Sequence, residues 1–313
     1  MNIEWLLAFL NPPQILIAPL YCIITIEFML LFLYMIDLHV HTTASDGQYS
    51  PTEIIQKAAE KNIKAIAITD HDTISGLKEA ETEAKNHDLI FIPGVELNIN
   101  FPVGEFHLLG LGFKKISDSL SNLLNFLQEN RDTRNLSMIQ KMQADGVDIS
   151  LEEIKNDFPN TVIGRPHIAA ELVKKKIVKN SQQAFNKYLA KGKPWYASRI
   201  GLNLDEAIVA IKESEGIPVI AHPMSLYISW GKLPETLQDF YERGVCGLEA
   251  FHPGARVTEC LRLEELARKI GYFVTAGSDF HGEKIRSDRK LGFTCGGKKI
   301  DDKYYFEELA KFK

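Results

Sequence analysis

Short runs of alternating hydrophobic and polar residues recur along this chain, and stretches with helical periodicity separate most of them. In residues 36–41 aliphatic side chains alternate with Asp37, His39 and His41, so a strand there places both imidazoles on one face. Similar apolar runs predict six further strands, at residues 65–69, 89–100, 105–113, 217–223, 244–253 and 271–281. Strands that alternate with helices in this way predict an α/β fold, with a parallel sheet closed into a barrel.

Segments with helical periodicity divide the chain into a frame and an insertion. Three of them alternate with the predicted strands, at residues 50–62, 75–86 and 202–216. From residue 117 to residue 190 the pattern is helical throughout, which predicts an insertion within the α/β frame. The predicted boundaries are a barrel frame at 35–116 and 191–292, a helical insertion at 117–190, and a tail with a short helix at 293–313.

The first 34 residues differ from the rest of the chain in composition. Residues 15–35 are mostly aliphatic and aromatic, interrupted by Pro19 and Glu27. This stretch is hydrophobic enough to insert into a membrane, but no Lys or Arg precedes Lys57, so neither a signal peptide nor a positively charged flank is indicated. Two interpretations of residues 1–34 remain: a membrane helix, or an upstream extension if translation starts at Met35.

Composition and charge narrow the class of protein. With 45% hydrophobic and 25% charged residues the chain has the composition of a soluble protein, and its net charge of −5 argues against extensive coating of nucleic acid. The four cysteines show no CxxC pair and no spacing typical of a disulfide framework. These features predict reduced thiols and a cytoplasmic location, with membrane association only through residues 1–34.

Residues able to bind metal ions occur at the ends of the predicted strands, where catalytic groups gather in (β/α) barrels. The candidate ligands are His39, His41, Asp46, His71, Glu96, His107, His222, Asp279 and His281. One catalytic ion uses about three or four protein ligands, so this set indicates two or three ions. Imidazole and carboxylate ligands without thiolate suit divalent Mn²⁺, Fe²⁺ or Zn²⁺, with Mn²⁺ as the first candidate.

The motifs in these segments resemble, in order, those of the PHP (polymerase and histidinol phosphatase) family: DLHVHTTASDG, ITDHDT, PGVE, FHLLGLGF, IAHP and GSDFH. The resemblance extends from about Met35 to Gly292 and implies a distorted (β/α)7 TIM-like barrel with a trinuclear metal centre. It implies three ligand sets, with Glu96 bridging the first two: His39, His41, Glu96 and Asp279; Glu96, His107 and His222; and Asp46, His71 and His281.

A basic segment lies within and just after the predicted insertion. Residues 161–200 contain nine Lys or Arg and one acid, a local charge of +8 in a chain of −5, so the remainder sums to −13. A basic insertion above a metal site is suited to attract a polyanion. The candidate substrate-binding residues are Arg165, His167, Arg134 and Lys193. Arg165 and His167 begin a predicted helix, where anions bind, whereas surface exposure is the plainer interpretation of Arg134.

The candidate catalytic residues are His252 and Asp70. His252 follows the sixth predicted strand and is suited to contact phosphate, to protonate the leaving oxygen, or to support a neighbouring ligand. Asp70 precedes a candidate ligand and is better suited to orient ligands or cap a turn than to bind metal.

Further motifs resemble those of the stand-alone PHP phosphoesterases: GRPHIAAELV, AFNKYLAKGKPWY and the FHP at Phe251. That resemblance implies a hydrolase of phosphoric esters acting on 3′,5′-nucleoside bisphosphates or on short RNA from the 5′ end, with a metal-bridging hydroxide as nucleophile. Two alternatives remain: a small-molecule phosphomonoesterase of the histidinol-phosphatase type, and a non-catalytic metal-binding PHP module.

Overall fold

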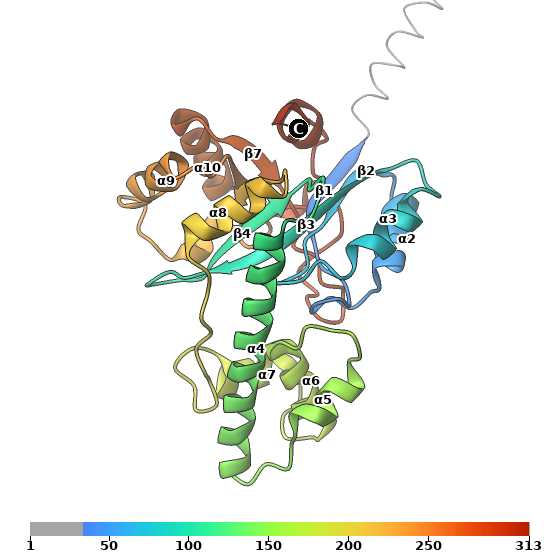
Figure 1. Cartoon of the computed structure of the whole chain (residues 1–313), viewed down its shortest axis with the longest axis vertical. Coiled ribbons are helices and arrows are strands. Elements are labelled where there is room, and N and C mark those ends of the chain that lie inside the picture. The colour runs from blue at the N-terminus through green and yellow to red at the C-terminus, as the bar shows by residue number, and fades with distance from the viewer. Residues whose placement is uncertain (1–33, 313) are drawn as a thin grey trace, which may run out of the picture. The chain divides into compact units, whose positions relative to one another are not determined.

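A seven-stranded sheet with helices packed around it forms the body of the protein, in a computed structural model that describes residues 34–312 (Figure 1). The strands are β1 (Met35–Val40), β2 (Ile63–Ile68), β3 (Ile90–Ile99), β4 (Phe106–Leu111), β5 (Ile217–Ile220), β6 (Gly247–Phe251) and β7 (Phe273–Ala276). They lie side by side in chain order. The predicted α/β class and its seven strands are confirmed.

One strand of the sheet runs against the others. β4 is antiparallel to both β3 and β5, whereas all other neighbouring strands are parallel. The prediction of a wholly parallel sheet is therefore wrong at β4. Residues 100–105 alone connect β3 to β4, which suffices for a hairpin but not for the crossover of about a dozen residues that parallel neighbours need.

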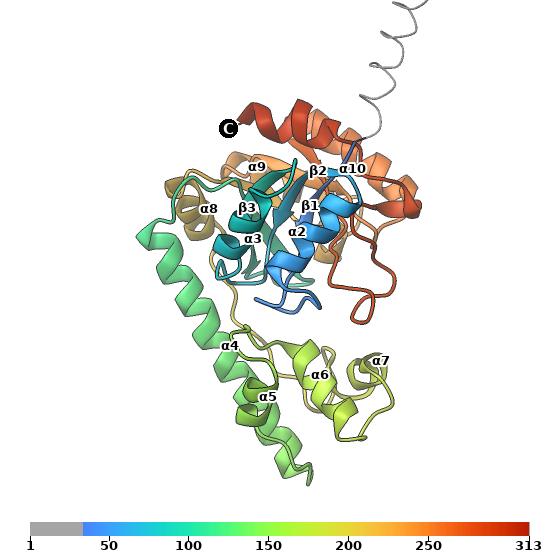
Figure 2. The same cartoon turned by 90° about the vertical axis from the view of Figure 1, so that its right-hand side faces the viewer.

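Five helices pack around the sheet: α2 (Pro51–Glu60), α3 (Leu77–Ala84), α8 (Leu204–Glu213), α9 (Leu233–Glu242) and α10 (Val257–Ile270). In Figure 2, α2 and α3 lie together on one side of the sheet. At the start of α2 the Ser50 hydroxyl accepts a hydrogen bond from the Glu53 N–H, and the Glu53 carboxylate accepts one from the Ser50 N–H. Such a cap stabilises a helix start by about 1 kcal/mol.

The strands pack into two layers of apolar side chains. Ile66 and Ile68 of β2 share one cluster with Ile54 and Ile55 of α2, and all four are fully buried. Burying one such side chain contributes roughly 1.5–3 kcal/mol. These contacts hold the strands rigidly, so the positions of the residues that follow each strand are well determined.

Between β4 and β5 the chain forms a helical segment with a core of its own. Its elements are α4 (Asp118–Ala144), α5 (Leu151–Asp157), α6 (Arg165–Lys174), α7 (Ser181–Ala184) and a π-helical turn (Phe185–Leu189). α4 extends away from the sheet, and α5, α6 and α7 gather beside its distal half (Figures 1 and 2). Trp195 stacks on Tyr188 with ring centroids 4.0 Å apart and belongs to the core of this segment. Trp195 thus packs with this segment although it follows residue 190, where the sequence analysis places the end of the insertion.

The sequence analysis makes one prediction for each end of the chain. The membrane helix or upstream extension was assigned to residues 1–34, of which the structure describes only Tyr34. Across residues 34–312, no helix has the combination of length and apolar character that spanning a bilayer demands. The predicted short C-terminal helix is a π-helical turn (Tyr304–Glu308) followed by a 3₁₀ turn (Leu309–Phe312), and Tyr304 and Leu309 pack into the main core.

Candidate metal centre

The ends of several strands bring histidines and a carboxylate to one edge of the sheet. His41 directly follows β1 and His71 follows β2. β3 continues past its pairing with β2, so Glu96 also reaches this edge. His107 arrives there because β4 runs in the opposite direction, which puts the beginning of β4 beside the end of β3.

The Glu96 carboxylate lies at the middle of the cluster and is almost fully buried. Its Oε1 lies 2.7 Å from Nδ1 of His107 and 2.9 Å from Nε2 of His222. Its Oε2 lies 2.9 Å from Nδ1 of His71. Burial alone would raise the pKa of Glu96, but the surrounding imidazoles hold it well below its usual range. Both oxygens of one ionised carboxylate thus face several nitrogen donors, which is the arrangement of a bridging ligand.

The paired histidines of β1 face two carboxylates. Their Nε2 atoms, in His39 and His41, lie 3.4 and 3.3 Å from Oε2 of Glu96. The same atoms lie 3.7 and 3.3 Å from Oδ1 of Asp279. Burial alone would lower the pKa of His41, but Asp279 and Glu96 raise it to about 10. The pocket between these side chains therefore favours additional positive charge.

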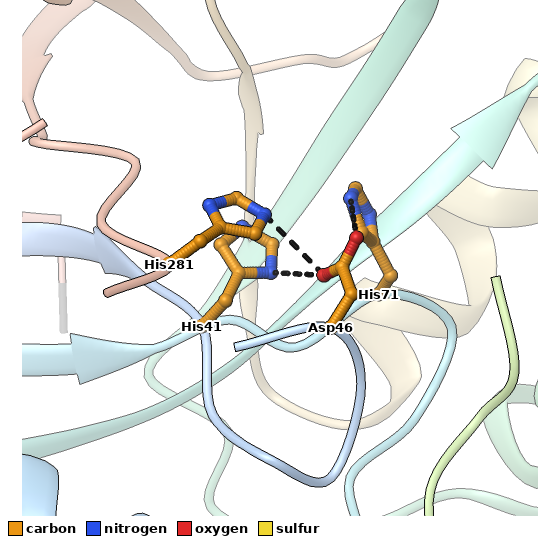
Figure 3. Close-up of side chains that lie close together, drawn as sticks. All are labelled: His41, Asp46, His71 and His281. Atoms are coloured by element: carbon orange, nitrogen blue, oxygen red, sulfur yellow. Dashed lines mark ion pairs between the residues drawn. The ribbon is translucent and has the colours of Figure 1, made fainter. Parts of the chain in front are cut away.

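A second group of donors surrounds Asp46 (Figure 3). Its Oδ1 lies 3.3 Å from Nε2 of His281 and 3.7 Å from Nδ1 of His41, and its Oδ2 lies 4.0 Å from Nε2 of His71. The ring of His281 stacks on that of His41 with centroids 3.9 Å apart. Three imidazoles and one carboxylate thus converge without thiolate, a set suited to divalent transition metals.

Several atoms of this cluster are buried without any hydrogen-bond partner: Nε2 of His39, both ring nitrogens of His41, and Oε2 of Glu96. Buried polar atoms are otherwise almost always hydrogen-bonded. Donor atoms at these separations can share an ion whose bonds are about 2.0–2.2 Å long. The described residues contain four such groups: His41, Asp46, His71 and His281; His39, His41 and Asp279; His39, Glu96 and His222; and His71, Glu96 and His107. Together they comprise all nine candidate ligands, and the donor set fits metal ions.

Glu249, in the middle of β6, supports two of the candidate ligands. Its Oε1 lies 3.0 Å from Nδ1 of His39, and its Oε2 accepts a hydrogen bond of 2.7 Å from the backbone N–H of His222. Because a carboxylate can only accept, Nδ1 of His39 carries the hydrogen in this contact, and in the neutral ring Nε2 therefore holds the lone pair that faces Glu96. The sequence analysis did not single out Glu249, although one carboxylate in an otherwise apolar strand was a signal for a buried role.

Asp70 orders the loop that carries Asp46. Its carboxylate accepts hydrogen bonds from the backbone N–H and the hydroxyl of Thr42, each 2.7 Å long, and from the Ser45 hydroxyl at 2.6 Å. Within the described residues, all hydrogen bonds of the Asp70 side chain are with this loop. The structure therefore places Asp70 as a support for the metal-binding loop rather than beside the converging donors.

His252 lies close to the cluster. Its Nδ1 accepts a hydrogen bond from the Gly254 N–H at 3.0 Å, and its Nε2 lies 3.2 Å from Oδ2 of Asp279. The first contact leaves the proton on Nε2. His252 is buried and lines a large cavity that opens over the candidate ligands.

This cavity of about 2120 Å³ lies between the strand ends and the helical segment, and guanidinium groups line much of it. Arg131 and Arg199 both contact the buried carboxylate of Asp72, Arg199 at 3.0 Å. Arg134 lines the same cavity, is 7% exposed, and makes no hydrogen bond or ion pair within the described residues. The interpretation of Arg134 as a surface arginine is therefore wrong. The positions of Arg131 and Arg134 depend on how α4 packs, which periodicity does not reveal.

The other predicted substrate-binding residues occupy different environments. Arg165 lines the cavity and contacts Glu105 at 3.2 Å. His167 also lines the cavity, but its Nδ1 accepts the Gly164 N–H at 2.9 Å and thereby caps α6. Lys193 is exposed and is not part of the cavity wall, so the structure does not bring it to the site. Arg199, which the prediction omitted, takes a place in the wall instead.

The fold and the nitrogen and oxygen cluster define a metal-binding α/β protein. A family model described as the PHP domain matches residues 37–192. A 5′-3′ exoribonuclease of Haemophilus influenzae is 32% identical over 85% of this chain and 94% of its own length. A 3′,5′-nucleoside bisphosphate phosphatase of Chromobacterium violaceum is 32% identical over 79% of this chain and 87% of its own. The chain belongs to the PHP domain family, which confirms the resemblance found in the sequence.

A solved structure supports the same relationship. A protein from Bifidobacterium adolescentis, assigned as a metal-dependent phosphoesterase, superposes with a TM-score of 0.78 at 27% identity. The superposition covers 89% of this chain and 96% of the other. The fold is thus shared over nearly the whole length of both proteins.

Proposed function

We propose that this protein is a metal-dependent phosphoesterase that hydrolyses phosphate esters of nucleotides. The observation that carries the proposal is the buried Glu96 carboxylate, whose Oε2 has no hydrogen-bond partner and lies close to Nε2 of His39 and Nε2 of His41, which also have none. Three divalent ions, with Mn²⁺ as the first candidate, would use the following ligand sets: His39, His41, Glu96 and Asp279; Glu96, His107 and His222; and Asp46, His71 and His281. Bound there, such ions acidify water and neutralise phosphate oxygens, which phosphoester hydrolysis requires.

The protein's own residues position the reaction. Glu249 keeps the lone pair of His39 directed at the cluster, and Asp70 holds the loop that carries Asp46. His252 carries a proton on Nε2 beside Asp279, where it can be given to the leaving oxygen of a bound ester. Glu249 and Asp70 thus orient candidate metal ligands, and His252 supplies the proton.

A second phosphate group of the substrate would bind at Arg134. Burial, together with repulsion from Arg131 and Arg199, lowers the pKa of Arg134. A bound anion would therefore stabilise the charged form of this guanidinium. Asp72 neutralises part of the charge of Arg131 and Arg199 and leaves Arg134 without a counterion. Arg165, which contacts an exposed carboxylate of Glu105, is available to join it. The two curated relatives are named for substrates that carry more than one phosphate or a phosphodiester chain.

We further infer that the sheet closes as a distorted barrel. Val40 and Phe280 form a parallel bridge between the regions that follow β1 and β7. The N–H of His41 donates to the Phe280 carbonyl at 3.0 Å, and the N–H of Asp279 donates to the His39 carbonyl at 2.9 Å. We place the barrel frame at 35–116 and 191–292 and the helical insertion at 117–190. The cytoplasm, where free thiols persist, suits the free cysteines of the described chain.

Phosphate release from adenosine 3′,5′-bisphosphate, with Mn²⁺ supplied, tests the proposed function. The wild-type protein should release one phosphate per molecule, and replacing both His39 and His41 by alanine should abolish release and bound metal together. His87→Ala is the matched control, because His87 contacts Glu83 on the surface of α3 and lies outside the cavity. Activity that survives loss of both β1 histidines would refute the mechanism.

Arg134→Gln tests the second-phosphate site. It should raise KM for the bisphosphate by roughly 10- to 100-fold, the effect of losing a charge-assisted contact, with little change for a nucleoside monophosphate. Equal effects on both substrates would place Arg134 elsewhere in the reaction. A wild-type enzyme indifferent to the second phosphate would instead indicate a monoester phosphatase.

A further inference from the structure

The loop that follows β7 brings a second pair of arginines to the cavity. Residues 282–290 directly follow His281 in the segment after β7, and Arg286 and Arg289 of this loop line the cavity wall. Arg289 is 5% exposed, which is unusual for an arginine without a strong partner. This pair comes from the frame rather than from the helical segment that supplies Arg134.

The two guanidinium groups approach the outer oxygen of Asp279. Its Oδ1 faces the β1 histidines, whereas its Oδ2 faces Arg286 at 3.8 Å and Arg289 at 3.9 Å. His252 meets the same Oδ2 at 3.2 Å. Both arginine distances exceed hydrogen-bond length, so these donors converge on Asp279 without being used by it.

Arg289 has more hydrogen-bonding capacity than its surroundings use. Its Nε is buried without a partner, and its other ion pair, at 3.2 Å, is with Asp288, a carboxylate that is 62% exposed. A buried arginine with a purely structural role normally satisfies its donors with hydrogen bonds.

The absence of a side chain at Gly254 leaves room for the Arg289 guanidinium. A Cβ at Gly254 would lie 3.2 Å from a terminal nitrogen of Arg289 and 2.9 Å from the His252 ring. Glycine at this position therefore lets Arg289 and His252 lie next to each other. The result is a corner with two cations and one imidazole N–H, all beside a candidate metal ligand.

We infer that Arg286 and Arg289, together with Nε2 of His252, form the binding corner for the phosphoryl group that undergoes hydrolysis. This assignment rests on the proposed function and extends it. The pair would contact the non-bridging oxygens of the reacting group, while Arg134 and its neighbours would hold the remote phosphate. A guanidinium presents two parallel N–H groups to such oxygens, which suits the empty space beside Oδ2 of Asp279.

Inorganic phosphate is the probe for this corner, because it mimics the reacting group without a second phosphate. Calorimetric binding to the Mn²⁺-loaded full chain should weaken roughly 10- to 100-fold in Arg289→Met, with smaller losses in Arg286→Gln and Arg289→Lys. Metal content should stay at the wild-type value in all three. Arg262→Met is the matched control, since this exposed arginine stacks on Trp230 outside the cavity.

The outcomes separate this inference from the function on which it rests. Wild-type phosphate affinity in both Arg286→Gln and Arg289→Lys, with a loss only in Arg134→Gln, would overturn the assignment. If the wild-type chain binds phosphate through Arg289 but releases none from the bisphosphate, the proposed function fails while the binding corner stands. Should Arg289→Met fail to fold, Arg286→Gln decides, because Arg286 is 39% exposed and its replacement is tolerable.

Discussion

Glu249→Gln is a sharp test of the metal centre, because Glu249 acts only through the candidate ligands. Its two oxygens accept hydrogens from Nδ1 of His39 and from the backbone N–H of His222. Glutamine keeps the shape but replaces one acceptor by an NH₂ group, which would then face a donor. One of the two contacts must therefore be lost, or His39 must change its tautomer and turn a hydrogen towards Glu96.

The size of the effect follows from the lost contact. A hydrogen bond to a charged group contributes about 1.5–3 kcal/mol, and losing such a support typically weakens metal binding by about 10- to 100-fold. We therefore expect Mn²⁺ affinity to fall by that factor in Glu249→Gln. Because the defect lies in binding, phosphate release should recover at saturating Mn²⁺.

The assay is equilibrium dialysis of Mn²⁺ against the metal-free chain, paired with phosphate release across a Mn²⁺ titration. Glu265→Gln, an exposed replacement on α10, is the matched control and should behave as the wild type. Unchanged Mn²⁺ affinity in Glu249→Gln would contradict the role of His39 as a ligand oriented by Glu249. Lost activity that no Mn²⁺ concentration restores would instead assign Glu249 to the chemical step.

Three further outcomes are expected. Gly277→Ala should lower both stability and metal affinity, since its Cβ would lie 2.3 Å from Cβ of His39 and 2.5 Å from Oε1 of Glu249; thermal melts and metal analysis would show this. Removing metal with a chelator should lower the melting temperature. Adding Mn²⁺ back at 100 times its Kd should raise the free energy of unfolding by about 2.7 kcal/mol. Burial raises the pKa of Asp37 from 3.8 to about 6. Between pH 4 and pH 7 the free energy of unfolding of the metal-free wild type should therefore fall by up to about 3 kcal/mol relative to that of Asp37→Asn, as measured by denaturant unfolding. A pH-independent difference would contradict this.

The sign of the last effect follows from proton linkage. Between pH 4 and pH 6 the unfolded chain has released the proton of Asp37, whereas the folded chain retains it. This contribution of Asp37 to stability therefore falls as the pH rises through the window, and it is absent from Asp37→Asn, which lacks the carboxyl group.

The candidate ligands could be predicted because they depend on local geometry. A strand places His39 and His41 on one face, and the residue that follows a strand must lie at the sheet edge. The direction of β4 was also readable in principle, because residues 100–105 are too few for a crossover. Its reversal leaves His107 at the same edge, so the error about the sheet did not displace a ligand.

The charged walls of the cavity could not be predicted in the same way. Arg131 meets Asp72 only because α4 packs against the frame, and Arg289 lies beside Asp279 only through the path of a loop. Such contacts depend on the packing of distant segments, which leaves no periodic signal in the sequence. The basic segment at 161–200 did indicate an anionic ligand, but four of its exposed lysines lie outside the cavity: Lys174, Lys176, Lys187 and Lys193.

The strand-end motifs in the sequence and the packing of the arginines in the structure therefore answer different questions about this enzyme. Strand-end ligands determine that phosphorus chemistry is possible. The arginines determine which phosphates are held, and they arise from α4, α6, the segment after α7, and residues 282–290. Exchanging those segments should change substrate preference while leaving metal binding intact, since no ligand in the four donor groups lies within them.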